Sequence, residues 1–123
     1  MRAWTLWTLS LAAGALVAAV VDANAAATLA PNEIQAAFFT GQPFTASTPS
    51  NVKFKMTFTP DGKVTREPVG KSGVKGEGTW KLDKAGFCTT WKNSKQGCFT
   101  VTTNNDNKWS VMRGTTLVAV WTK

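Results

Sequence analysis

Apolar and polar residues alternate through most of the chain after residue 50, a pattern typical of strands with one buried face. In the clearest segment, residues 51–59, lysine and threonine alternate with Val52, Phe54, Met56 and Phe58. The sequence PDG at 60–62 follows and predicts a three-residue hairpin turn. Such a turn places Phe58 opposite Val64 and Met56 opposite Arg66, so Arg66 is predicted to point inward.

Five more segments continue this pattern between recurring turn signals (DKAG, KNSKQG and NNDN). They are predicted strands at 76–82, 87–91, 98–103, 108–113 and 115–122. About seven strands joined as successive hairpins indicate a mainly β fold with one short N-terminal helix. We predict a small antiparallel meander barrel or sandwich, lipocalin-like in form, and the alternation leaves open whether its interior is packed or hollow.

Residues 28–41 carry a helical pattern instead, with Asn32 or Thr28 as the expected cap and Pro31 in the first turn. Gly41 is expected to end this short helix. Residues 42–50, QPFTASTPS, are rich in Pro, Ser and Thr and predict a loop. We therefore divide the chain into a leader at 1–25, a helix and loop at 26–50, and a barrel domain at 51–123.

The leader is predicted from an apolar run over 4–21 that ends in an A-x-A pattern at Ala23 and Ala25. These features are typical of a secretory signal peptide that is cleaved after Ala25 or Ala27, rather than of a retained membrane anchor. We therefore expect a periplasmic or secreted protein with no membrane span after cleavage.

The chain has two cysteines, Cys88 and Cys98, and no histidine. Two cysteines without histidine cannot complete a structural zinc site, and an oxidising compartment favours a disulfide. Their predicted strands form one hairpin, which sets Cys88 opposite Cys98. Phe87, Trp91 and Phe99 then lie on the other face of the hairpin. We expect a structural disulfide and no bound metal.

No catalytic constellation emerges from the sequence. Without histidine or a free thiol, Ser-His and Cys-His nucleophiles are excluded, and the acidic residues do not converge in the predicted register. The glycine-rich segment at 70–78, GKSGVKGEG, lacks the spacing of a phosphate-binding loop. The expectation is a protein that is not an enzyme and has no cofactor.

The net charge is +7, from 14 basic and 7 acidic residues, and stays +7 if Arg2 and Asp22 leave with the leader (13 minus 6). A lysine-rich surface is either a solvated face or a binding face for an anionic envelope component. Export argues against nucleic acid. Candidate ligand-binding residues are Arg66, Trp80, Trp91 and Trp109, with two alternatives left open: the tryptophans could be core, and Arg66 could extend to the rim or anchor an anion inside.

The order of motifs EIQAAFFTG, FTPDGK, GEGTW, CTTW and CF resembles small secreted proteobacterial proteins grouped in families of unknown function. The resemblance implies an envelope location and a β-rich fold, and no activity. A looser resemblance is to one-disulfide β-barrel inhibitors of metalloproteases in the Gram-negative periplasm. The expected function is thus non-enzymatic binding of a small ligand or an anionic envelope component, with protease inhibition as the alternative. Inhibition of lysozymes is disfavoured, since these are usually cationic.

Overall fold

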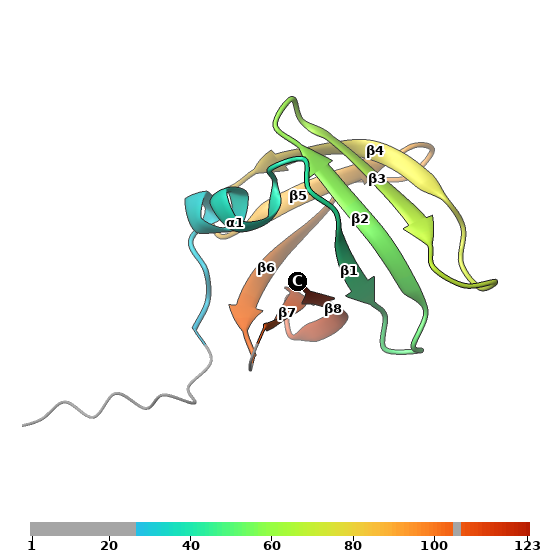
Figure 1. Ribbon diagram of the computed structural model, residues 1–123. Helices are drawn as coiled ribbons and strands as arrows, with labels where there is room; N and C mark the ends of the chain where they lie inside the picture. The colour runs from blue at the N-terminus through green and yellow to red at the C-terminus, as the bar shows by residue number, and fades with distance from the viewer. Residues whose placement is uncertain (1–26, 105–106) are drawn as a thin grey trace, which may run out of the picture.

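The computed structural model describes residues 27–104 and 107–123, and these form one closed antiparallel β-barrel (Figure 1). Each strand pairs with its neighbours in sequence, and the first strand also pairs with the last. The strands are β1 (Phe44–Ser47), β2 (Lys53–Thr59), β3 (Lys63–Pro68), β4 (Gly76–Leu82), β5 (Phe87–Trp91), β6 (Gly97–Thr103), β7 (Lys108–Arg113) and β8 (Thr116–Thr122). The predicted mainly β barrel with one helix and one disulfide is confirmed.

Helix α1 (Pro31–Phe38) covers one end of the barrel. Pro31 occupies the first turn as predicted, but neither Asn32 nor Thr28 caps the helix. The N-cap is Ala30, whose amide donates to the Glu33 carboxylate at 2.7 Å. The Glu33 side chain, at the third helical position, thus accepts the hydrogen bond of the N-cap amide, and the N-cap residue itself provides no side-chain cap.

Strand β1 lies within the segment predicted to be a loop, and that prediction is wrong at Phe44–Ser47. The segment has only four strand residues between Pro43 and Pro49, too few for a clear alternation. Its backbone is ordered by partners on both sides: Thr45 pairs with Lys55 of β2 and with Thr122 of β8. Tertiary pairing, which local sequence does not encode, makes this strand.

The β2–β3 hairpin has the predicted register. Phe58 pairs with Val64 and Met56 with Arg66, around the turn at 60–62. Gly62 takes a positive φ of 92°, which a glycine adopts without strain. The Thr59 hydroxyl donates to the Asp61 carboxylate, and this hydrogen bond lowers the pKa of Asp61. The turn therefore keeps its ionised acceptor to a lower pH than an isolated aspartate would.

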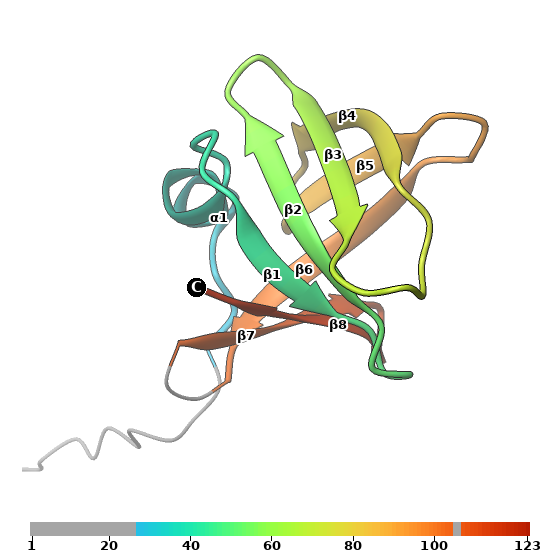
Figure 2. The ribbon, with the colours of Figure 1, turned by 45° about the vertical axis from the view of Figure 1, so that its right-hand side comes forward.

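The two ends of the barrel, a helix end and an open end, carry different connections (Figure 2). The helix end carries α1 and the connections 60–62 and 83–86. The open end carries the connections 48–52, 69–75, 92–96 and 114–115. Because consecutive strands run in opposite directions, every second connection falls at the same end.

The core lies at the helix end, where Phe38 and Phe39 of α1 and its C-cap enter the barrel. The Phe39 ring stacks on Phe58 with centroids 4.2 Å apart and also contacts Trp80 at 4.5 Å. Phe38 packs against Trp121 at 4.9 Å. Both phenylalanines are at most 2% exposed. The packing of these two aromatic rings and the apolar surface that they bury stabilise the fold, and a domain of this size depends on such contributions.

Cys88 and Cys98 form the predicted disulfide and pair directly across β5 and β6. Phe87 and Phe99 form the neighbouring pair in the same register, and both face the barrel interior. The connection 92–96 between the two strands is exposed, and it lies at the predicted turn signal KNSKQG. The bridge therefore fixes the register of a hairpin whose connection has no tight-turn sequence.

The predicted leader at 1–25 lies outside the described residues. Within the described part of the chain, no helix has the length and apolar character needed to cross a membrane.

Candidate functional site

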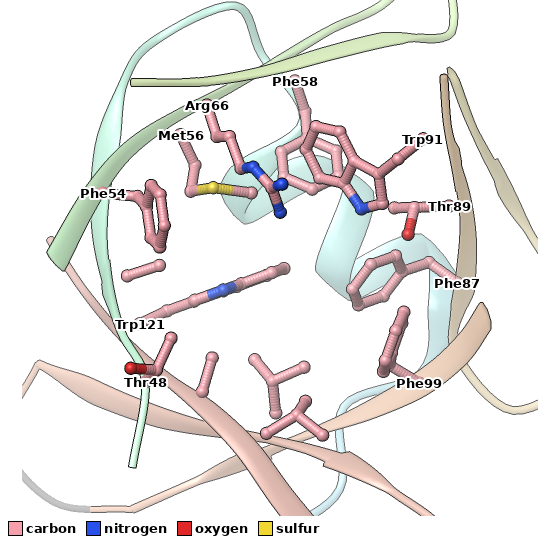
Figure 3. A pocket seen from close by; sticks show the side chains of 14 residues that line it. Thr48, Phe54, Met56, Phe58, Arg66, Phe87, Thr89, Trp91, Phe99 and Trp121 are labelled. Carbon is pink, nitrogen blue, oxygen red and sulfur yellow. The ribbon is translucent and has the colours of Figure 1, made fainter. Parts of the chain in front are cut away.

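The barrel is packed at the helix end and hollow at the open end, which answers the question that the alternation left open. A cavity of about 190 Å³ lies inside it (Figure 3). Seen from the open end, helix α1 lies behind the cavity, and Phe58, Phe87 and Trp121 separate the two. The aromatic cluster that binds α1 is thus also the floor of the cavity.

The cavity wall is largely apolar. Its polar side chains are one arginine, Arg66, and two threonines, Thr48 and Thr89; no acidic residue of the described chain is among the lining residues. The apolar lining includes Phe54, Met56, Phe99, Val111 and Val118. An apolar wall with few polar groups is typical of sites for small ligands, in which the polar groups fix the ligand's orientation.

Arg66 projects over the cavity near Met56 and Trp91. Its Nε donates to the Val74 carbonyl at 3.1 Å, and its guanidinium carbon lies 4.7 Å from the centroid of the Trp91 ring. The same carbon lies 5.4 Å from the Phe54 ring. These contacts hold the cation between two aromatic rings, where the guanidinium is weakly hydrated and suited to bind a carboxylate in a bidentate manner.

Thr89 is the one buried polar residue of the described chain, only 4% exposed. It lies on β5 between Phe87 and Trp91, and the three line the same cavity. Among the described residues, no buried side-chain nitrogen or oxygen lacks a hydrogen-bond partner. A hydroxyl in an apolar wall is a second group that a polar ligand atom can contact.

Strand β8 contributes two consecutive residues to the cavity because of a bulge. Val111 pairs with Ala119, but Met112 pairs with Leu117, so Val118 is the extra residue. Both Val118 and Ala119 line the cavity, and Leu117 is turned outward and 39% exposed. A bulge reverses the inward and outward faces of a strand, which explains an exposed leucine that strict alternation would bury.

The four predicted ligand-binding residues divide between the two ends. Arg66 and Trp91 line the cavity, whereas Trp80 and Trp109 pack against α1 and are not among the lining residues. The Trp80 indole donates to the Thr59 carbonyl at 2.8 Å, a structural contact. Sequence reasoning missed Trp121 in the floor, although its place in the last strand alternates correctly for an inward side chain.

Lysines surround the open end. Its connections contain Lys71, Lys75, Lys92 and Lys95, all exposed, and no aspartate or glutamate. The connections 60–62 and 83–86 at the helix end contain Asp61 and Asp83 against Lys84. Positive charge is therefore concentrated around the mouth of the cavity, where it attracts anions.

A group of potential metal-binding atoms occurs at Asp83, Cys88 and Cys98. Both sulfurs are engaged in the disulfide, so neither is the thiolate that binds a metal ion. Asp83 instead orders its own turn by accepting from the amides of Ala85 and Gly86 at 3.1 and 2.8 Å.

No protein-family model, curated protein or solved structure matches the chain. The arrangement offers an apolar cavity, one cation held at its mouth, a buried hydroxyl and an outer ring of lysines. Together these features favour reversible binding of a small molecule with an apolar body and an anionic group.

Proposed function

We propose that this chain is an exported, non-enzymatic binding protein whose barrel takes a small amphiphilic carboxylate. The observation that carries the proposal is Arg66, the lone charged residue lining an otherwise apolar cavity in the described chain. An uncharged apolar ligand would make no ion pair with this cation, and a highly polar ligand would make few apolar contacts with the cavity wall. A carboxylate on a small apolar body uses both.

The cavity volume limits the size of the ligand. A cavity of roughly 150 Å³ is enough for a benzene molecule, and this one holds about 190 Å³. The expected ligand therefore has one aromatic ring or a short aliphatic chain, with its carboxylate at Arg66. Its apolar end would rest on Trp121, and Thr89 is placed to contact a further polar atom.

Export is part of the proposal and rests on the predicted leader at 1–25 and on the disulfide. Disulfides persist in oxidising compartments, and Cys88 and Cys98 are joined in the barrel. The resemblance to secreted proteobacterial proteins supports the same location. A binding protein there would meet small carboxylates that enter or leave the cell.

The alternative of protease inhibition has no structural observation in its favour. The inhibitors of the looser resemblance insert an N-terminal segment into the protease. Here residues 27–29 are tied to β6: the Leu29 amide donates to the Val101 carbonyl at 2.8 Å, and the Thr103 amide to the Ala27 carbonyl at 2.9 Å. This part of the chain is held against the barrel.

The proposal is tested by titrating the protein with benzoate and with benzamide, its neutral analogue of similar size. Calorimetry reports binding, as does the tryptophan fluorescence, to which the cavity residues Trp91 and Trp121 contribute. We expect benzoate to bind with a Kd of roughly 10 µM to 1 mM, because a ligand with so few atoms makes too few contacts for a higher affinity. We also expect it to bind at least about tenfold tighter than benzamide. Hexanoate and hexanol form the corresponding aliphatic pair.

Arg66→Met removes the cation while keeping an apolar side chain, and Arg113→Met is the matched control. Arg113 is exposed at the same end of the barrel but does not line the cavity. Loss of a charged hydrogen bond should weaken benzoate binding by about 10- to 100-fold in Arg66→Met and leave benzamide binding nearly unchanged. Equal effects of the two arginine variants, or no binding of either carboxylate, would refute the proposal.

A further inference from the structure

All large apolar side chains that are exposed in the described chain lie at the open end. Val69 is 62% exposed and Val74 is 69% exposed, both in the connection between β3 and β4. Leu117, at 39%, follows the β7–β8 turn at the same end. Single exposed apolar residues need no explanation, but their confinement to one end of a barrel does.

The same end carries the four exposed lysines of its connections, Lys71, Lys75, Lys92 and Lys95. These connections contain no acid, but Glu67 and Glu77, on the adjoining ends of β3 and β4, line a depression together with Lys75. Lys71 lies between the two exposed valines in sequence, and Lys75 follows Val74 directly. Apolar side chains interspersed with cations are typical of a surface that enters the interface of an anionic bilayer. There the apolar side chains leave water and the cations are attracted to the headgroups.

A surface depression at this end adjoins the cavity. Its lining residues include Val74 and Lys75 from one connection, Lys92 and Asn93 from another, and Arg66 and Trp91. Glu77, on β4, also lines it. Arg66 and Trp91 belong to the internal cavity as well. A surface that covered the open end would therefore lie over both the depression and the residues that the two share.

We propose that the open end docks on an anionic lipid surface, with Val69 and Val74 in the interfacial layer and the four lysines against the headgroups. A soluble polyanion would contact the lysines but would gain nothing from the valines, so the bilayer is the partner that accounts for both. The inference does not depend on which ligand the cavity holds. It goes beyond ligand binding by placing the cavity mouth at the membrane surface.

The backbone of the β3–β4 connection suits this role. Gly73 has a φ of 102°, and a Cβ at this position would come within 2.9 Å of the Phe54 ring. The connection therefore passes close over Phe54 on β2. This path leaves Val69 and Val74, on either side of Gly73, directed to solvent.

The test measures partition onto vesicles that contain 30% phosphatidylglycerol in phosphatidylcholine, with pure phosphatidylcholine vesicles as the comparison. The protein is recovered after export of the full chain, so that every variant has the same N-terminus. The open-end variant carries Lys→Gln at 71, 75, 92 and 95. The control carries Lys→Gln at 63, 81, 84 and 108, four exposed lysines at or near the helix end that remove the same charge.

Each lysine near an anionic surface contributes a factor of roughly five to binding. We therefore expect the open-end variant to lose at least about 100-fold in partition, the control to lose less than about fivefold, and both effects to shrink at high salt. Val69→Ser with Val74→Ser should lower partition about tenfold while all charges remain.

The proposal is overturned if the two lysine variants lose binding equally, because net charge alone would then explain it. It is also overturned if wild type does not bind phosphatidylglycerol vesicles, or if the valine variant binds vesicles and soluble heparin as well as wild type. Benzoate titration without vesicles is independent of these results. A failure of docking is thus distinguishable from a failure of ligand binding.

Discussion

The two ends of this barrel are built from the same eight strands but differ in packing and in charge. At the helix end the connections are short, and Phe38 and Phe39 fill the interior. At the open end three of the four connections are longer, the interior is hollow, and the charged residues of the connections are lysines alone. The densest packing lies at the helix end, and the cavity that we propose binds a ligand lies where packing is incomplete.

The comparison shows how a chain of this size can have a cavity at all. In a small domain, the free energy gained by burying apolar surface exceeds the conformational entropy cost of folding by only a small margin. The stabilisation that a cavity forgoes must therefore come from dense packing nearby. Here the floor of the cavity and the seat of the helix are the same side chains, Phe58, Phe87 and Trp121. One aromatic layer both stabilises the fold and shapes the site.

The largest expected effect comes from the same substitution made at each end. Phe39→Ala removes a ring that is 2% exposed and stacked on Phe58, and should lower the free energy of unfolding by about 3 to 5 kcal/mol. Phe54→Ala, at the cavity mouth, should cost about 1 to 2 kcal/mol because its ring is only partly buried. Chemical denaturation measures both, and equal losses would contradict the division between the ends.

The disulfide gives the next effect. Cys88→Ser with Cys98→Ser should lower the free energy of unfolding by about 2 to 4 kcal/mol, because the unfolded chain regains the entropy of an open loop. Benzoate binding should persist in this variant, since neither sulfur lines the cavity. Mass spectrometry after alkylation, with and without reductant, checks the pairing; free thiols without reductant would contradict a structural bridge.

The smallest effect on stability, and the sharpest on function, comes from filling the cavity. Ala119→Leu adds methyl groups to open space and should change stability by less than about 1 kcal/mol while lowering benzoate affinity at least about tenfold. Ala37→Leu is the matched change against the packed helix end and should cost about 1 to 3 kcal/mol without affecting binding. If Ala119→Leu left affinity unchanged, the ligand would have to bind elsewhere.

Local chemistry made part of this fold predictable. The turn at 60–62 fixes the β2–β3 register within a few residues, so the inward direction of Arg66 follows from the sequence alone. The pairing of Cys88 with Cys98 follows in the same way. Such features depend on residues close in sequence.

Other features depend on distant partners. Alternation places both Trp80 and Trp91 inward but does not say which end of the barrel each faces. The direction of the strands does: β5 ends at Trp91 toward the open end, while β4 runs toward the helix and carries Trp80 there. The bulge at Val118 has no local signal of its own, since it arises from the pairing of β7 with β8.

Strand β1, four residues long, has one more consequence. Its pairing with both β2 and β8 closes the barrel, so no strand of the described chain has a free edge. Without it, β2 and β8 would each present a row of unpaired amides and carbonyls, the template on which other chains add in edge-to-edge aggregation. The short segment between Pro43 and Pro49 thus removes edge-to-edge strand pairing as a route by which this strand-rich protein could associate with its own copies.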